Sequence, residues 1–178
     1  MRLQDKVNKQ VAPQMAKEQN VNRLSLPMIN KIVVNSGIGP FRADKNTVEL
    51  IKNDLIKITG QIPKKTISKK SISGFKVRIN DHVGFVVTLR NKKMWDFLEK
   101  LINLSIPRIR DFKGLDEKGF DREGNYTFAI REHIIFPEIE QEDVTATWGL
   151  AVTIVFENSD IKLNKKFLDM IGMPIKKR

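Results

Sequence analysis

Cysteine is absent from the 178-residue chain, and several other chemically useful residues are scarce. Without cysteine the chain has no disulfide framework, no thiolate nucleophile and no cysteine-based zinc site. Two histidines, one tyrosine and 7% aromatic residues offer little for catalysis or for base stacking of the kind that RRM and OB modules use. No segment is long and apolar enough to span a bilayer, and the N-terminal residues lack the apolar core of a signal peptide.

Acidic residues are too few to balance the basic ones. Lys and Arg total 32 against 21 Asp and Glu, which leaves a net charge of +11. Such an excess indicates a polyanionic partner, either a nucleic acid or an anionic membrane surface. The excess is densest in residues 64–78 (KKTISKKSISGFKVR), which hold six cations and no acid. Because this stretch does not make a continuous amphipathic helix, a membrane is the weaker alternative and RNA the expected partner.

The chain has the composition of a globular protein, with 40% hydrophobic and 30% charged residues. Its length fits a single domain over residues 1–178. In residues 44–60, Asn46 and Glu49 resemble a capping box, and Gly60 is a plausible helix end. The residue patterns predict strands at 30–39, 74–79, 83–90, 126–136 and 147–156, helices at 44–60, 92–106 (ending before Pro107) and 165–172, and a long loop at 110–125. This order predicts an α/β (α+β) fold in which a mostly antiparallel sheet is backed by helices on one face.

Three of the predicted strands alternate between large apolar residues and small, polar or cationic ones. In residues 83–90 the odd-numbered positions are apolar, whereas Thr88 and Arg90 lie on the other face. In residues 126–136, Arg131 and His133 fall on that open face. Helices are expected to cover the apolar face. The open face could simply meet water, but its scarcity of Asp and Glu favours a surface that faces phosphates.

Candidate enzymatic motifs are weak. The turn NSGIGPFR lacks the third glycine of a dinucleotide-binding fingerprint, because Arg42 stands in its place. His82 and His133 have no metal-ligand spacing around them. The carboxylates of residues 136–143 could suggest a hydrolase, which Glu138→Gln would inactivate, but a solvated acidic turn explains them better. The chain is therefore expected not to be an enzyme and to need no cofactor.

Five stretches are long and specific enough to compare with known families. They are, in chain order, RLSLPMINKIVVNSGIG, GFKVR, VTLRNKKMWDFLEKLINLSIPRIRDFKGL, GFDREGNYTFAIREHIIFPEI and the terminal GMP. In this order they closely resemble the bacterial-type fifth protein of the large ribosomal subunit, a family that binds 5S ribosomal RNA. The resemblance runs from about Leu3 to Pro174. It implies a two-layer sandwich of the ferredoxin-like or RRM-like kind.

The resemblance also implies partners. These are 5S rRNA and other large-subunit rRNA in the central protuberance, neighbouring large-subunit proteins, transfer RNA in the P site, and small-subunit ribosomal protein thirteen across an intersubunit bridge. The expected location is the cytoplasm, in the ribosome, with an organellar ribosome left open. A free-standing RNA-binding module or RNA chaperone is the alternative, and co-sedimentation with the large subunit would separate the two.

The family's RNA-contacting positions can be carried over residue by residue. Its asparagine after the first strand matches Asn35, its glutamine matches Gln61, and its threonine matches Thr88, with Arg90 beside it. Phosphate contacts are expected from the basic stretch, at Lys64, Lys65, Lys69 and Lys70. The family's hairpin near the P-site transfer RNA corresponds to residues 73–84, here with Ser73, Gly74, Phe75, Lys76, Arg78, Asn80 and His82 as the candidates. Three residues depart from the family pattern: Asp81, Glu123 and His133.

Overall fold

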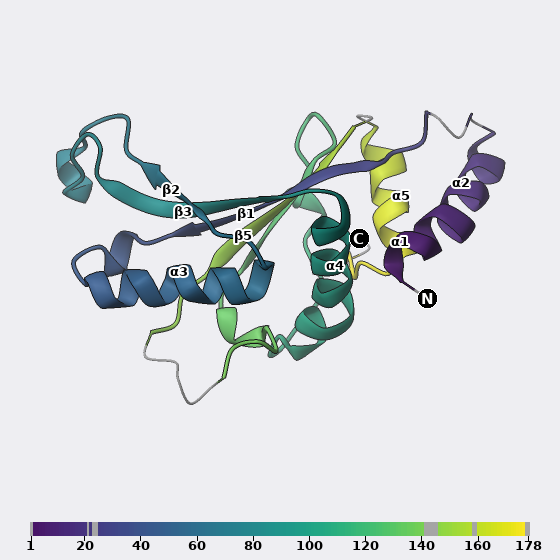
Figure 1. Cartoon of the computed structure of the whole chain (residues 1–178). Coiled ribbons are helices and arrows are strands. Elements are labelled where there is room, and N and C mark those ends of the chain that lie inside the picture. Colours follow the sequence, from purple (N-terminus) through teal and green to yellow (C-terminus); the bar gives the residue numbers. More distant parts are fainter. Residues whose placement is uncertain (1, 21, 23–24, 141–145, 158–159, 177–178) are drawn as a thin grey trace. The chain divides into compact units, whose positions relative to one another are not determined.

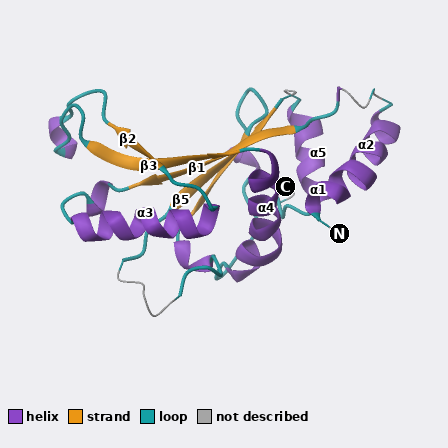
Figure 2. Cartoon of the chain, viewed as in Figure 1, coloured by secondary structure: helices purple, strands orange, loops and turns teal. Residues whose placement is uncertain are grey.

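The computed structural model describes residues 2–20, 22, 25–140, 146–157 and 160–176 (Figure 1). Its strands are β1 (Ile29–Gly37), β2 (Lys64–Ile67), β3 (His82–Leu89), β4 (Tyr126–Ile130) and β5 (Leu150–Phe156). Its α-helices are α1 (Leu3–Lys6), α2 (Ala12–Gln19), α3 (Lys45–Thr59), α4 (Asn91–Lys100) and α5 (Ile161–Ile171). Figure 2 shows the strands gathered in one sheet.

The sheet has the order β2-β3-β1-β5-β4. β2 runs antiparallel to β3, with Lys64 opposite Val86 and Lys65 opposite Phe85. Backbone hydrogen bonds from Ile38 to Val83 (3.1 Å) and from Glu157 to Met28 (2.9 Å) extend the antiparallel pairing of the neighbouring strands. The predicted α+β class, an antiparallel sheet combined with helices, is therefore confirmed.

The chain divides into two compact units, and several strands contribute residues to both. One unit, called here the loop unit, comprises Val33–Thr88 and Ala129–Val152. The other, called the terminal unit, comprises Met1–Ile32, Leu89–Phe128 and Thr153–Arg178.

In the loop unit, α3 covers one face of the strands (Figure 1). Its Ile51, Leu55 and Ile58 are at most 1% exposed, as their helical spacing predicts. Gly60 ends the helix with φ +64°, a conformation that glycine adopts without steric cost, so this prediction is confirmed. The predicted capping box is wrong, because Asp44 is the N-cap and its carboxylate accepts from the amide of Asn46 at 2.9 Å.

In the terminal unit, α4 and α5 supply the buried helical faces. α5 begins four residues earlier than predicted because Asp160 caps it, accepting from the amides of Lys162 (2.9 Å) and Leu163 (3.4 Å). The helical path after α4 continues as a wider turn over Leu101–Ser105 and a 3-10 turn over Ile106–Arg108. The predicted stop before Pro107 is therefore wrong; proline is tolerated there because it lies in the first turn of the 3-10 segment.

Residues 3–19 are helical, which was not predicted from the sequence. α1 and α2 are joined by a π-helical turn over Val7–Val11. Leu3, Val7, Val11 and Met15 are all at most 6% exposed. Their spacing of four residues places them on one side of a helix, so a signal was present in the sequence.

Two predicted strands are only partly formed. Residues 74–79 were predicted as the strand next to β3, but the segment forms a 3-10 turn at Ser73–Phe75 and a single β-bridge between Ile72 and Val77. The strand that pairs with β3 at this edge is β2. The segment buries no apolar face, since Phe75 is 77% and Ile79 59% exposed. β4 ends at Ile130, and a 3-10 turn follows at His133–Ile135.

Candidate nucleic-acid interface

Three of the predicted RNA contacts lie close to the sheet in the loop unit. Asn35 is exposed on β1 between the buried Val34 and Ser36, so its side chain faces away from α3. Thr88 is half-buried on β3, between the buried Val87 and Leu89.

Gln61 connects the end of α3 to this face. It lies one residue after the helix-ending Gly60, and its Nε2 donates to the backbone oxygen of Thr88 at 3.3 Å. The contact brings Gln61 and Thr88 together and leaves the oxygen of the Gln61 amide for a partner. The predicted open face of the sheet is thus present, with small and polar residues at these positions.

Arg90 belongs to the terminal unit, where it is the exposed N-cap residue of α4. Its guanidinium donates to Oδ1 of Asn30 at 3.3 Å, which holds the side chain against β1. On the same unit, the hydroxyls of Thr127 and Thr153 lie 3.0 Å apart and join β4 to β5. Thr127 is exposed, as the strand pattern predicts.

The four candidate lysines do not form one surface. Lys64 and Lys65 are consecutive exposed residues of β2, so their side chains point to opposite faces of the sheet. Lys64 is opposite Val86, on the open face, whereas Lys65 is opposite the buried Phe85, on the face that carries α3. Lys69 and Lys70 are exposed in the loop after β2. Sequence reasoning missed this division because β2 was not predicted as a strand.

Most of the predicted hairpin near transfer RNA (73–84) lies in a compact projection, the 68–81 loop, and its last three residues belong to β3. Its base is closed by backbone hydrogen bonds from Ser68 to Asp81 (2.9 Å) and from Asn80 to Ser68 (3.0 Å). A second pair of backbone hydrogen bonds joins Ile72 and Val77 at 2.9 and 3.1 Å. The loop is therefore ordered by its own backbone rather than by a hydrophobic core.

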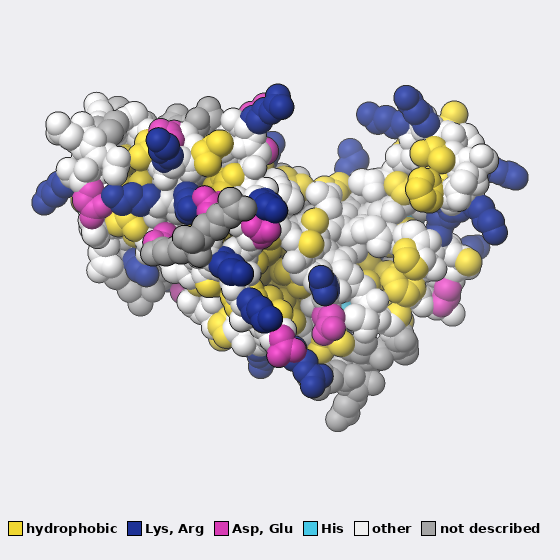
Figure 3. All heavy atoms as spheres, turned by 180° about the vertical axis from the view of Figure 1, so that it is seen from behind, with side chains coloured by type: hydrophobic (Ala, Val, Ile, Leu, Met, Phe, Trp, Pro, Cys, Tyr) yellow, Lys and Arg dark blue, Asp and Glu magenta, His cyan; other side chains and the backbone are white. Residues whose placement is uncertain are grey.

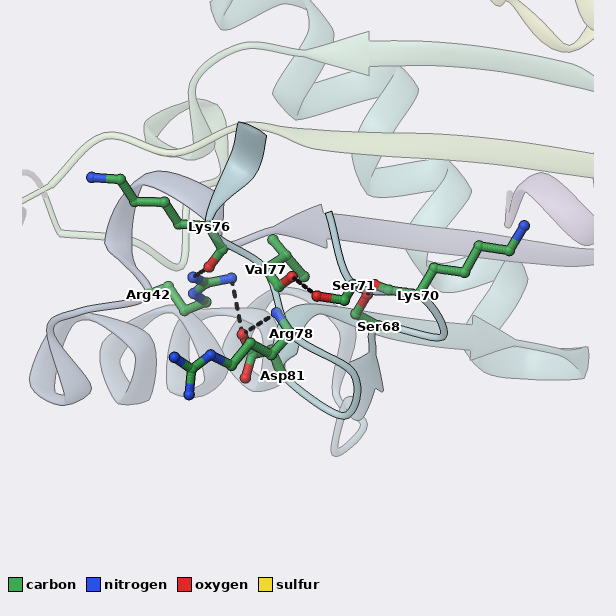
Figure 4. Close-up of polar contacts among 8 residues, drawn as sticks. All are labelled: Arg42, Ser68, Lys70, Ser71, Lys76, Val77, Arg78 and Asp81. Carbon is green, nitrogen blue, oxygen red and sulfur yellow. Dashed lines mark hydrogen bonds and ion pairs between the residues drawn. The ribbon is translucent and has the colours of Figure 1, made fainter. Parts of the chain in front are cut away.

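The side chain of Asp81, one of the departures from the family pattern, points toward Arg42 and the backbone of Arg78 (Figure 4). Its carboxylate accepts from the amide of Arg78 at 2.8 Å and lies 3.5 Å from the guanidinium of Arg42. Arg42 also donates to the backbone oxygen of Lys76. These contacts of Arg42, here called the clasp, tie the tip and the C-terminal end of the 68–81 loop to the turn after β1. Sequence reasoning did not identify Arg42 as a positioning residue.

The surface of the loop combines cations with exposed apolar side chains. Figure 3 shows dark blue and yellow side chains gathered on this projection. Ile72 (48%), Phe75 (77%) and Ile79 (59%) supply exposed apolar area. The exposed cations are Lys69, Lys70, Lys76 and Arg78. After the loop, Nε2 of His82 donates to the backbone oxygen of Gly84 at 2.9 Å, and the ring packs edge-on against Phe85.

His133 is not on the open face, which corrects the prediction. It is 1% exposed, stacks on Trp148 with ring centroids 4.6 Å apart, and its Nε2 lies 3.8 Å from Asp54. The open face was predicted by extending the strand alternation past Ile130, where β4 ends. Burial lowers the pKa of His133, although the charge of Asp54 opposes this effect. His133 is therefore a packing residue of the loop unit.

The described part of the chain contains no group of three or more His, Cys, Asp or Glu residues that could hold a metal ion. Among the same residues, no helix has the length and hydropathy needed to cross a bilayer. Of the acidic stretch 136–143, residues 141–143 lie outside the described residues.

Comparison with known proteins identifies the family. Residues 22–78 match the family described as Ribosomal protein L5, and residues 82–175 match the C-terminus of the same ribosomal family. The large ribosomal subunit protein uL5 of Malacoplasma penetrans is 47% identical over 176 residues, covering 98% of this chain and 94% of the relative. The chain belongs to the ribosomal protein L5 family.

Other members of the L5 family match nearly as well. The uL5 protein of Colwellia psychrerythraea is 45% identical over 87% of this chain and 86% of its own length. That of Geotalea daltonii is 41% identical over 98% of both chains. The predicted family is thereby confirmed. The chain is a ribosomal protein of the large subunit and not an enzyme, as the weak catalytic motifs predicted.

Proposed function

We propose that the chain binds 5S rRNA in the central protuberance of the large subunit. The observation that carries this proposal is the open sheet face, where Asn35 and Thr88 are presented by rigid strands and the amide of Gln61 is held beside Thr88. Arg90, which donates to Asn30, is a separate cationic candidate on the terminal unit. Polar groups held by strands lose little conformational entropy on binding, which favours recognition of a folded RNA.

The lysines add a second component, which depends on charge. Lys64, Lys69 and Lys70 are exposed in the loop unit, and Lys64 lies on the open face. Lysine contacts to phosphates position an RNA without reading its sequence. We therefore propose that the polar residues of the open sheet face give the specificity for 5S rRNA, and that these lysines add affinity for RNA in general.

The 68–81 loop is proposed to approach transfer RNA in the P site and to lie beside the bridge to small-subunit ribosomal protein thirteen. Its exposed Lys76 and Arg78 can neutralise phosphates, and Phe75 can stack on an exposed base. Asp81 does not oppose this role, because its charge is directed at Arg42. We propose the ribosomes of the cytoplasm as the location, because the uL5 relatives that match the chain are bacterial.

The test compares 5S rRNA with an unrelated RNA of equal length across a salt series. Asn35→Ala removes one contact from the open face and should weaken 5S rRNA binding by about 2- to 13-fold, equivalent to about 0.5–1.5 kcal/mol. Asn53→Ala is the matched control, because Asn53 is exposed on α3. Asn35 is a cleaner choice than Gln61, whose removal also breaks the contact with Thr88.

Equal affinity of wild type, Asn35→Ala and Thr88→Ala for 5S rRNA would remove the open face from the binding site. Equal affinity of the wild type for 5S rRNA and the unrelated RNA would instead favour a general RNA-binding role.

A further inference from the structure

A second cationic surface lies in the loop unit, on the side of the sheet that carries α3. It is a pocket of about 380 Å³ between the turn after β1, the N-terminal half of α3, and strands β2 and β3. We call it the α3-side pocket. Its charged lining consists of Arg42, Lys45, Lys52 and Lys65 with one carboxylate, Glu49. Four cations from three separate segments of the chain thus converge on one hollow.

The charges of this pocket are only partly neutralised within the protein. Arg42 lies 3.5 Å from Asp81. Within the part of the chain that the structure describes, Lys45, Lys52 and Lys65 make no ion pair with a carboxylate. Bringing like charges together costs free energy, and a bound anion would remove that cost. The arrangement therefore favours an anionic ligand.

The length of the lining indicates the kind of anion. Lys45 and Lys52 are seven residues apart on α3, which corresponds to about 10 Å along the helix axis. This span exceeds a single phosphate group and suits successive phosphates of a nucleic-acid strand. The uncharged lining is mostly apolar (Ile38, Val48 and Phe85), and its one polar member, His82, already uses Nε2 in a hydrogen bond to the backbone oxygen of Gly84 at 2.9 Å. The pocket is therefore suited to holding a backbone, not to reading a sequence.

We propose that the α3-side pocket binds the phosphate groups of a second RNA strand. This site goes beyond the proposed contact with 5S rRNA, because Asn35 and Thr88 project from the opposite face of the sheet. The boundary between the two sites runs through β2, where Lys64 faces one side and Lys65 the other. The chain would then hold two RNA segments, one on each side of the loop unit.

The test uses the full-length protein and a twelve-nucleotide oligouridine, with binding located by methyl NMR. The methyl signals of Ile38 and Val48, which line the pocket, should shift when oligouridine is added. Replacing Lys45, Lys52 and Lys65 with Gln should abolish these shifts and reduce the slope of log affinity against log salt by about 0.7 for each phosphate that is no longer neutralised. All three substitutions replace side chains outside the core, and an unchanged melting temperature would show that the fold is intact.

A charge-matched control replaces Lys64, Lys69 and Lys70 with Gln. It removes the same three charges from the loop unit but none from the pocket, so the shifts at Ile38 and Val48 should remain. Glu49→Gln gives a test of opposite sign, because it removes the carboxylate that the described residues contribute to the lining and should tighten oligouridine binding by about two- to fivefold. Unchanged shifts in the pocket variant, or loss of shifts in the control alone, would overturn the proposal.

Two further experiments distinguish a nucleic-acid strand from free phosphate as the ligand of the pocket, and distinguish the pocket from the proposed 5S rRNA site. Inorganic tripolyphosphate that shifts Ile38 and Val48 at the same concentration as oligouridine would overturn the assignment to a nucleic-acid strand. Asn35→Ala should weaken 5S rRNA binding and leave the oligouridine shifts unchanged. Failure of 5S rRNA to bind would therefore count against the proposed function alone, whereas absence of the pocket shifts in wild type would count against the second site alone.

Discussion

The clasp between Arg42 and the 68–81 loop can be tested by its effect on local opening. Arg42→Gln removes the ion pair with Asp81 and the hydrogen bond to the backbone oxygen of Lys76. The side chains of Arg42 and Asp81 are 29% and 34% exposed, so the ion pair contributes about 0.2–1 kcal/mol at most. With the hydrogen bond to Lys76, the clasp should stabilise the closed loop by about 1–2 kcal/mol. Its removal should raise the open population of the loop about 5- to 30-fold.

Amide hydrogen exchange measures this population directly. The amides of Ser68 and Asn80 close the base of the loop and should exchange about 5- to 30-fold faster in Arg42→Gln. The amide of Gly60, bonded to Ile56 at the end of α3, should be much less affected. Binding of 5S rRNA, which is proposed to use the opposite face of the sheet, should change less than exchange does, because its affinity depends on the closed fraction, which stays near one while the open state is rare.

Arg78→Gln is the control for charge. It changes the net charge equally, but the clasp survives because Asp81 accepts from the backbone amide of Arg78 and not from its side chain. Exchange at Ser68 and Asn80 should therefore stay close to that of wild type. Asp81→Asn should accelerate exchange as Arg42→Gln does, although it changes the net charge in the opposite direction. Equal exchange rates at Ser68 and Asn80 in wild type, Arg42→Gln and Asp81→Asn would refute the role of the clasp.

Three other predictions concern stability. Burial keeps the pKa of His133 below its usual value, against the opposing charge of Asp54, so the unfolded chain takes up this proton at a higher pH than the folded chain does. The free energy of unfolding should therefore fall as pH drops below about 6.5, by at most about 1.4 kcal/mol per pH unit. His133→Gln should reduce the slope of the unfolding free energy, measured with denaturant, against pH; equal slopes in the variant and the wild type would contradict this. Burial raises the pKa of Tyr126 to about 12. Because Tyr126 is the only tyrosine in the chain, ultraviolet absorbance reports its ionisation alone, which should occur near pH 10 in the unfolded protein and well above pH 10 in the folded protein. Because the unfolded chain releases that proton first, stability should fall above about pH 10, and a folded-state midpoint near 10 would argue against the burial. Gly84→Ala would place a Cβ 2.6 Å from a backbone oxygen of β1 and should cost about 1–3 kcal/mol in thermal unfolding, whereas Gly37→Ala, with nothing within 4 Å, should cost much less.

The elements that were predicted correctly are those in which burial and local pattern agree. The spacing of Ile51, Leu55 and Ile58 predicts α3, and the alternation of Leu150–Phe156 predicts β5, because each pattern brings apolar side chains to one face. The details of helix ends were less accessible. Asp44 and Asn46 are both good N-cap residues, and only the backbone conformation at Asp44 decides between them.

The errors near the candidate site have a different cause. β2 (KKTI) has neither the alternation nor the apolar content of a typical strand, since it forms by pairing with β3 and not by burying its own side chains. Residues 74–79 look more like a strand but bury nothing. The clasp joins Arg42 to Asp81 across 39 positions of sequence, and no local pattern encodes such a contact. The residues carried over from the family could be named from sequence, but the division of Lys64 from Lys65 required the strand register.

The position of β2 at the edge of the sheet has a consequence before any RNA is bound. An edge strand exposes backbone donors and acceptors on one side, and two such edges can pair between molecules and begin aggregation. Lys64 and Lys65 place a positive charge on both faces of this edge, so two copies that approach through β2 would repel each other. The same lysines that are proposed to hold RNA thus help to keep newly made chains apart until they are assembled.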